Sequence, residues 1–586
     1  MKNSVKKTIE KIKFALNKRF VIPHGTTLDR VISSLSQSEK LVFWILVLVL
    51  ILSTLSIFSK VNDSVLVEIK APGGSFTEGV VGFPRFVNPV LALSDADRDL
   101  VSLIYSGLLK ATPEGGLIPD LAEGYTVSDD GLVYEFTLKE GVVFHDGEPV
   151  TVDDIIFTLD KTLDTTLKSA QRANWDGILT EKINDRTIRF TLARPYAPFL
   201  QNTTIGILPK HIWGHVDSKE FPFSEINTSP VGSGPYAVRS VKKNSSDIPE
   251  TYILTSFKEY ALNKPFINKI TLRFYQNETD LISAFNKGSI DAVNSISPEA
   301  ITHIKAERIE RTPLPRIFAV FFNQNTAQIF SHIEVRKALN TAVDKGNIVD
   351  TVLTGYGTPI DGPIPPLSIN RKTAAFPTEE NSDRIAEAKD ILSRNGWKFD
   401  EEVGVWMSSD KEPLRFSVAT SNVPELKAVA AILESVWEEL GAEVEIKVFE
   451  AGNLNQNIIR PREYDALLFG EVIGRELDLF AFWHSSQRND PGLNIALYAN
   501  ITADALLEKG RTFLNTEQRD ETYLKFEEEI KKDIPAIFLY SPDFIYIIPE
   551  RIQGVSLGSV TTSGDRFLNV HEWFIRTDKV WSIFSE

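Results

Sequence analysis

The chain contains no cysteine among its 586 residues. Disulfide bonds, thiolate nucleophiles, zinc fingers and iron–sulfur clusters all need that side chain, so each of them is excluded. A lipid-modified cysteine anchor is excluded for the same reason. The absence does not decide the compartment, because an exported domain can also fold without disulfides.

Acidic side chains outnumber basic ones beyond the first forty residues. The chain has 63 Lys and Arg against 79 Asp and Glu, a net charge of −16. Residues 1–40 carry nine Lys and Arg and three Asp and Glu, a net +6, which leaves −22 for residues 41–586. Phosphate contacts need clustered basic side chains, so we expect no nucleic-acid partner.

Catalytic and metal-binding signatures are few. The chain has no His-Glu-x-x-His and no Gly-x-x-x-x-Gly-Lys-[Ser/Thr] motif. His145 lies in an Asp-Gly turn, and the pair His211 and His215 has metal-ligand spacing but no evident third ligand. The glycines Gly232 and Gly234 precede a predicted strand, whereas a phosphate loop opens a helix. We therefore expect no catalytic residue, no metal and no cofactor, with a hydrolase as a less favoured alternative.

The longest uncharged hydrophobic run covers residues 41–58. As a helix it would extend about 27 Å, close to the hydrocarbon thickness of a bilayer. The basic segment before it places residues 1–40 in the cytoplasm and the body outside. A cleaved signal peptide is the alternative, but the forty-residue lead and the lack of an A-x-A-like site favour an uncleaved signal anchor.

The remaining chain has the composition of a globular protein, with 42% hydrophobic and 10% aromatic residues, and is long enough for two or three domains. Residues 117–159 predict a strand, a turn, a strand, a turn and a helix. Asp130 and Gly131 have turn chemistry. The alternation from Leu132 to Leu138 predicts a half-buried strand, and the apolar run 142–144 a second, shorter one. Thr151 then predicts a helix N-cap.

Helices and strands alternate through the rest of the chain. Residues 98–109 and 424–440 predict helices, the second ended by Gly441. Residues 318–323 form a continuous apolar run that indicates a buried strand. Strands are also expected at 444–448 and 464–470, so the pattern indicates an α/β fold.

Three stretches together resemble one known family. They are LIPDLAEGYTVSDDGLVYEFTLKEGVVFHDGEPVTVDDIIFTL at 117–159, PVGSGPY at 230–236 and VRKALNTAVDK at 335–345. They resemble the peptide/nickel-type (family 5) extracellular solute-binding proteins of ABC transporters, which include oligopeptide- and dipeptide-binding proteins. The resemblance extends over about residues 64–570.

The resemblance implies an α/β, two-lobed clamshell like the class II periplasmic binding proteins, with three domains and one preceding transmembrane helix. The expected segments are a basic cytoplasmic segment 1–40, a transmembrane signal anchor 41–58, a split lobe 1 domain 64–92, 208–318 and 541–586, an inserted lobe 1 domain 93–207, and lobe 2 at 319–540.

In this family the lobes close over a ligand without making or breaking a bond. The resemblance implies that Glu471 or Asp478 pairs with a ligand ammonium, that Arg475 meets a carboxylate, and that aromatic side chains wall the pocket. The candidate ligand-binding residues are Glu471, Arg475, Asp478, Trp483, His484, Phe322, Asn323, Tyr105 and Phe86.

The expected function is capture of a peptide or peptide-like solute and its delivery to an ABC transporter permease. The body would lie in the periplasm or on the cell surface, held to the membrane by the N-terminal helix. A ligand-binding sensor or adhesion module with the same fold is the alternative.

Overall fold

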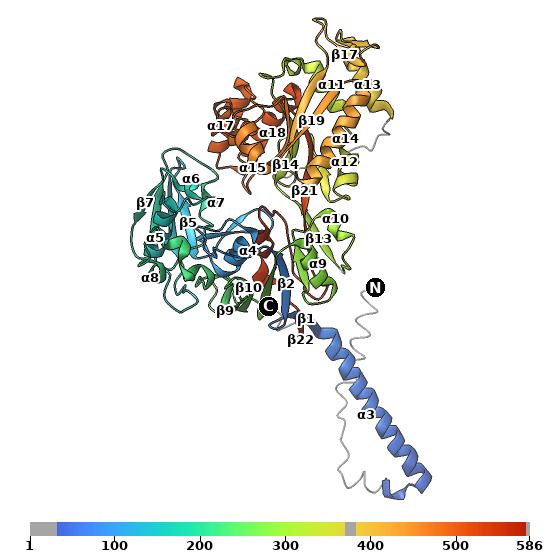
Figure 1. Cartoon of the computed structure of the whole chain (residues 1–586). Coiled ribbons are helices and arrows are strands. Elements are labelled where there is room, and N and C mark those ends of the chain that lie inside the picture. The colour runs from blue at the N-terminus through green and yellow to red at the C-terminus, as the bar shows by residue number, and fades with distance from the viewer. Residues whose placement is uncertain (1–31, 307, 370–381, 582–586) are drawn as a thin grey trace, which may run out of the picture. The chain divides into compact units, whose positions relative to one another are not determined.

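The computed structural model describes residues 32–306, 308–369 and 382–581 (Figure 1). The chain divides into two compact units. One consists of the residues up to Lys70 and those from Thr577 onward, and the other runs from Ala71 to Arg576. Most of the expected basic segment 1–40 lies outside the described residues.

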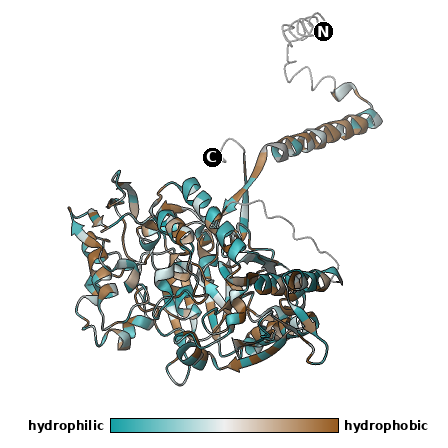
Figure 2. Cartoon of the chain, turned by 90° about the horizontal axis from the view of Figure 1, so that it is seen from above, coloured by the Kyte–Doolittle hydropathy of each residue, from teal (hydrophilic) through white to brown (hydrophobic). Residues whose placement is uncertain are grey.

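The first unit is built on helix α3, Gln37–Val65. Its start is capped reciprocally, because the Ser36 hydroxyl accepts a hydrogen bond from the Glu39 amide and the Glu39 carboxylate accepts one from the Ser36 amide. Hydrophobic residues make up most of this helix (Figure 2). Most of their side chains are exposed. Among the described residues it is the one helix long and apolar enough to span a membrane, over Gln37–Asn62.

A pair of strands completes the first unit. Strand β1, Leu66–Ala71, follows α3 directly and pairs with β22, Arg576–Trp581. The apolar helix is thus continued by a short strand whose partner comes from more than 500 residues further along the chain.

A single sheet of 12 strands runs through the second unit. Its strands, in the order in which they pair, are β19 (Glu443–Phe449), β18 (Arg415–Ser421), β20 (Ala466–Val472), β14 (Arg316–Phe322), β21 (Ala536–Ile547), β12 (Ala292–Asn294), β2 (Ser75–Val81), β11 (Lys269–Tyr275), β10 (Pro249–Ser256) and β9 (Tyr236–Lys243), with β13 (Ile309–Pro313) and β15 (Gly357–Pro359) also on β21.

Strand β21 belongs to both halves of this sheet. Its first part pairs with β14, from Phe321 opposite Ala536 to Phe318 opposite Tyr540. Its last part pairs with β12 and β13 near Ile547. One continuous backbone therefore connects the two halves, and the β14 pairing carries a register shift at Phe318 and Ala319.

Helices cover both faces of the half that contains β14 and β20. Leu468 of β20 points into one core and its neighbour Leu467 into the other, as expected for a strand buried on both sides. The helices lie on opposite sides of the sheet (Figure 1): α11 (Ile333–Ala342), α12 (Lys345–Val352), α13 (Ser382–Arg394) and α14 (Pro424–Leu440) on one, α17 (Ile501–Thr512) and α18 (Thr516–Asp533) on the other. The predicted α/β class is confirmed.

A smaller antiparallel sheet is inserted between β2 and β9. Its strands are β5 (Ala122–Val127), β6 (Val133–Leu138), β8 (Thr187–Thr191) and β7 (Leu179–Lys182), and helix α5 (Val152–Leu163) packs on it. The predicted turn is present, with Gly131 at φ 68°, and Thr151 is the N-cap of α5. The expected strand at 142–144 is reduced to one bridge between Val143 and Pro149, since proline cannot extend the ladder.

The other half of the large sheet packs on helix α4, Asp95–Ile104. The predicted helix at 98–109 therefore begins and ends earlier. It ends at Ile104 with Tyr105 as its C-cap, and Gly107 follows against the backbone of Thr204, where an added Cβ would be 2.7 Å from the Thr204 carbonyl carbon. Beneath α4, the fully buried guanidinium of Arg566 pairs with Asp99 and Glu78, each at 2.7 Å. This ion cluster joins α4, β2 and the turn η6, Ser563–Phe567.

Candidate functional site

A cavity of about 460 Å³ is lined by seven stretches of the second unit. Two candidate residues, Tyr105 and Arg475, line it. Its other polar walls come from β3 (Leu109–Ala111), the residue after β4 (Leu117–Pro119), the short helix α7 (Phe199–Asn202), and η6. Segments far apart in the sequence therefore supply its charged groups.

Arg475 holds one wall of the cavity. It follows β20, and its guanidinium lies 2.7 Å from the Asp565 carboxylate and donates to the Ser559 carbonyl at 2.8 Å. Only 5% of the side chain is exposed. The backbone amides of Thr561 and Thr562 also donate to Asp565, so the carboxylate that faces Arg475 is fixed in place. A preorganised arginine of this kind suits a ligand carboxylate.

Lys110 and Asp120 form a second charged group on the cavity. The Lys110 ammonium donates to the Tyr260 hydroxyl at 2.8 Å and lies 5.2 Å from that ring. Burial lowers the pKa of Lys110, and Asp120 opposes this shift. Burial likewise raises the pKa of Asp120, which Lys110 opposes.

Three acceptor oxygens of the cavity lining have no hydrogen-bond partner within the part of the chain that the structure describes. They are Asp120 Oδ1, Gln201 Oε1 and Thr561 Oγ1. Buried polar atoms are normally bonded, so these three oxygens are unsatisfied acceptors within the residues that line the cavity. None of the four polar residues Lys110, Asp120, Gln201 and Asp565 was predicted from the sequence. The one signal was the position of Asp120 directly after an apolar strand.

Tyr105 is held by backbone packing. Its hydroxyl donates to the Val87 carbonyl at 3.3 Å, and burial raises its pKa. A Cβ added at Gly206 would come within 2.6 Å of the Tyr105 side chain, which explains why glycine suits this position. Phe86 is half-buried against the core beneath α4 and is not part of the cavity lining.

Glu471 is buried on strand β20, opposite Ile317 of β14. Neither carboxylate oxygen has a hydrogen-bond partner among the described residues, and burial raises its pKa well above the ordinary value. The side chain shares a face of β20 with Leu467 and Phe469, which pack in an apolar core. It does not line the cavity.

Asp478 joins the inserted sheet region to helix α17. Its carboxylate lies 3.1 Å from Arg511 Nε and accepts a hydrogen bond from the Tyr196 hydroxyl at 3.4 Å. The Arg511 guanidinium also lies 4.5 Å from the Phe480 ring and 5.1 Å from the Tyr196 ring. We call Tyr196, Asp478, Phe480 and Arg511 the clasp. The charge of Asp478 is already paired in this conformation.

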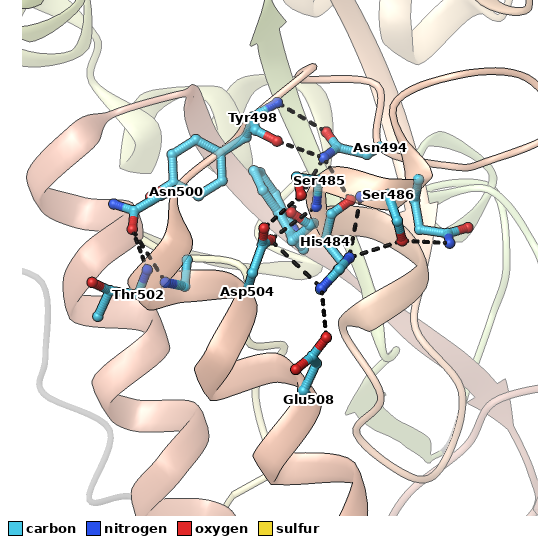
Figure 3. Close-up of polar contacts among 12 residues, drawn as sticks. His484, Ser485, Ser486, Asn494, Tyr498, Asn500, Thr502, Asp504 and Glu508 are labelled. Carbon is cyan, nitrogen blue, oxygen red and sulfur yellow. Dashed lines mark hydrogen bonds and ion pairs between the residues drawn. The ribbon is translucent and has the colours of Figure 1, made fainter.

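His484 takes part in a polar network around the start of α17 (Figure 3). Its Nδ1 lies 2.8 Å from the Ser486 hydroxyl, and its Nε2 lies 3.4 Å from Glu508. Asp504 accepts a hydrogen bond from the Ser485 amide at 2.9 Å. Serine, histidine and aspartate are also hydrolase residue types, but here the serine bonded to His484 is only two residues away. The contacts fix a turn against the helix.

Two other features that could indicate catalysis, His145 and a Gly-x-Ser-x-Gly segment, have structural explanations. The ring nitrogens of His145 contact backbone groups of Gly232 and Gly234, and burial lowers its pKa to about 4. Residues 554–558, GVSLG, match the Gly-x-Ser-x-Gly spacing of hydrolases. They form neither strand nor helix, so Ser556 lacks the strand-to-helix turn that such a nucleophile requires.

The aromatic candidates beside the predicted pocket lie in cores. Trp483 is fully buried against Phe321 and Phe538, and Phe322 is fully buried against Phe330. The Asn323 side chain donates to the Arg462 carbonyl at 2.9 Å and caps its own loop. These three residues stabilise the fold in this conformation and are not among the residues that line the cavity.

Comparison with known proteins agrees with this architecture. The chain is 28% identical over 521 residues to the oligopeptide-binding protein AppA of Bacillus subtilis, covering 87% of this chain and 94% of that protein. The structure of AppA in complex with a nonapeptide superimposes with a TM-score of 0.63 over 87% of this chain and 100% of that one, at 26% identity. NikZ of Campylobacter jejuni, in complex with Ni(L-His), gives a TM-score of 0.65 over 85% and 99% of the two chains, at 27% identity.

The family model for the bacterial extracellular solute-binding proteins, family 5, matches residues 116–490. That range includes the inserted sheet, the crossing strand β14, and Arg475 at the cavity. The chain therefore belongs to the family 5 bacterial extracellular solute-binding proteins.

Proposed function

We propose that this chain captures a peptide or peptide-like solute outside the cytoplasm and delivers it to the permease of an ABC transporter. The observation that carries the proposal is the cavity, whose lining includes two arginines (Arg98 and Arg475), a lysine and two carboxylates beside acceptor oxygens without a partner among the described residues. A peptide carries the complementary groups, namely an ammonium, a carboxylate and regularly spaced amide donors. The nonapeptide complex of the AppA relative supports the same ligand class.

Arg475 is the proposed partner of the ligand carboxylate. Its guanidinium has a planar fork of donors, and a ligand carboxylate would compete with Asp565 for them. Asp120 is the proposed acceptor for ligand N–H groups. Glu471, buried without a partner, is the proposed partner of a ligand ammonium once the lobes rearrange around the solute.

The proposed mechanism is hinge closure without covalent chemistry. The proposed domains are a split lobe 1 domain (64–92, 208–318 and 541–586), an inserted domain (93–207) and lobe 2 (319–540). The lobes meet along β14 and β21, which supply the hinge. Arg475 comes from lobe 2, and Lys110 and Asp120 from the inserted domain, so a ligand that contacts all three stabilises the closed state.

Helix α3 is the proposed membrane anchor. Its span Gln37–Asn62 has the length and composition of a transmembrane helix. Anchoring keeps the binding body at the surface where a permease takes up the solute. A protein that only carries a solute in this way needs no catalytic residue, which agrees with the solute-binding family.

The test is to purify the native full-length chain, denature it and identify what is released by mass spectrometry. We expect peptides, and a nickel complex, a sugar or no released ligand would argue against the proposal. The Arg475→Ala variant should release far less peptide and bind the identified peptide at least about tenfold more weakly, which is about 1.4 kcal/mol. The matched control is Arg415→Ala, because Arg415 makes an exposed ion pair with Glu443 on the edge of the sheet. Equal effects of the two variants would remove Arg475 from the site.

A further inference from the structure

The first unit joins the outer end of α3 to the strand pair through a tryptophan. Trp581, at the end of β22, donates from its indole nitrogen to the Asn62 side chain at 2.9 Å. The same strand pair carries an ion pair between Lys579 and Glu68 at 3.9 Å. The ring of Trp581 is nevertheless 51% exposed, and Val67 of β1 is 42% exposed.

The position of Asn62 on α3 determines how far the Trp581–Asn62 contact lies from the end of the apolar run. The uncharged run ends at Phe58, and four further residues of helix advance about 6 Å. Trp44 lies near the other end of the run, and its 18-residue separation from Asn62 corresponds to about 27 Å. The hydrocarbon core of a bilayer is about 30 Å thick. Trp44 and Asn62, the partner of Trp581, are therefore spaced so that they lie near the two boundaries of the hydrocarbon core.

The chemistry of these boundaries favours tryptophan. Trp and Tyr are enriched at membrane–water interfaces, because the ring is apolar and the N–H needs a polar partner. Helix α3 has Trp44 at one end of its apolar run but no Trp or Tyr after it. Trp581, fixed to Asn62, supplies at the other end the aromatic side chain that the helix itself lacks.

We propose that strand β22 is a second membrane contact, with Trp581 in the lipid headgroup region at the outer end of α3. This inference rests on the proposed membrane anchor. The occupant of the exposed Trp581 and Val67 surface is the bilayer itself, since this surface continues directly from the apolar helix. The body is thereby linked to the membrane through both of its covalent connections, at Lys70 and at Thr577.

The absence of native cysteine allows a depth measurement with single introduced cysteines. Full-length Leu50→Cys, Trp581→Cys, Asp578→Cys and Ser246→Cys variants would each carry an environment-sensitive dye in vesicles of phosphatidylethanolamine and phosphatidylglycerol. Nitroxide-labelled lipids then quench the dye from the headgroup or from deep in the acyl chains. We expect deep quenching at position 50, headgroup quenching at 581 and 578, and none at 246, which lies in an exposed turn of the body.

The outcomes separate this inference from the anchor on which it rests. Quenching at 50 with none at 581 or 578 would overturn the second contact and leave the anchor intact. Absence of quenching at all four positions would overturn both. The Asp578→Cys variant retains Trp581, so it remains informative if Trp581→Cys disturbs the strand pair. In the Asp578→Cys variant, an added Trp581→Ala substitution should reduce headgroup quenching at 578 to the level at 246. An added Trp581→Phe substitution should retain part of the headgroup quenching.

Discussion

Glu471 carries a carboxylate that the fold does not satisfy. It is buried, both oxygens lack a partner among the described residues, and burial alone raises its pKa well above the ordinary value. An unsatisfied buried group of this kind costs stability, and such costs persist mainly where function requires them. We therefore treat it as a residue whose effects on stability and on binding have opposite signs.

Replacing this carboxyl by an amide should stabilise the free protein. For Glu471→Gln we expect the free energy of unfolding at pH 7 to rise by about 1–3 kcal/mol, because no charge then has to be buried. Binding of a peptide with a free ammonium should weaken in the same variant. Calorimetry with and without peptide measures both effects. The exposed Glu445 gives a matched control, and Glu445→Gln should change neither quantity appreciably.

The pH dependence of folding stability follows from the raised pKa of Glu471. Below pH 4.5, the ordinary pKa of a glutamate, the carboxyl is protonated in folded and unfolded chains alike. As the pH rises, the unfolded chain ionises first, so stability is lost progressively up to the raised pKa of the folded state. Glu471→Gln should remove this part of the pH dependence in thermal melts. A variant with the same slope as the parent chain would show that Glu471 is charged and solvated.

Only some of the proposed ligand-binding residues could be predicted from the sequence. Arg475 and Tyr105 lie at the cavity. Phe322 lies in a core, because helices cover both faces of its strand and alternation then gives no solvent side. Trp483 lies on the short helix α16, Phe480–Trp483, and is buried against Phe321 and Phe538. Asp565 could not be predicted from the sequence, since its contact with Arg475 depends on how two distant segments pack.

Helix α14 is the element whose ends the sequence predicted best. Pro424 lies in its first turn, and Gly441 follows its last residue with φ 103°. Both confirm the predicted range 424–440. Proline and a left-handed glycine act locally. Helix α4 ends at Ile104, so its predicted end at residue 109 was wrong.

A side chain at Gly441 should destabilise this part of the fold. A Cβ there would lie 2.7 Å from the Phe399 ring, and the positive φ adds strain. We expect Gly441→Ala to lower the unfolding free energy by about 2 kcal/mol, measured from the melting of the full chain in detergent. Gly452→Ala is the control, because a Cβ at Gly452 meets nothing within 4 Å. Equal melting temperatures would contradict the assigned backbone conformation.

The clasp should contribute to closure. Removing the Arg511 charge breaks its ion pair with Asp478 and its contacts with two aromatic rings. We expect Arg511→Gln to weaken peptide binding about fivefold, about 1 kcal/mol, mainly through faster dissociation. Stopped-flow release of a labelled peptide measures the rate. Lys509→Gln on the same helix makes the same change of charge away from the clasp, and an equal effect there would indicate general electrostatics.

For the whole molecule, the sequence alone predicted the α/β class but not which strands pair with one another. Alternating helices and strands indicated α/β, yet β2 pairs with β11 nearly 200 residues later and β21 pairs with four other strands. Neither pairing has a local signal, because the partners are chosen by packing in three dimensions. The expected lobes came from the family resemblance, and their boundaries remain a prediction.

The anchor predicts the behaviour of the whole chain in a membrane. An uncleaved α3 should leave an intact mass of 65.7 kDa in the membrane fraction after carbonate extraction. Leu50→Lys should release the protein or block its insertion, since a lysine at the helix centre costs about 2.5–3.5 kcal/mol. Leu50→Ile should behave as the parent. A shorter mature chain in the soluble fraction would show that the segment is a cleaved signal.

The Arg566 cluster determines when the chain can finish folding. Its guanidinium neutralises Asp99 and Glu78, which precede it by 467 and 488 residues. Until residue 566 has been synthesised, burial of those two acids has no counter-charge, so the core around β2 and α4 cannot close over them. This core is therefore expected to reach its final packing only after the C-terminal segment of the chain has been synthesised.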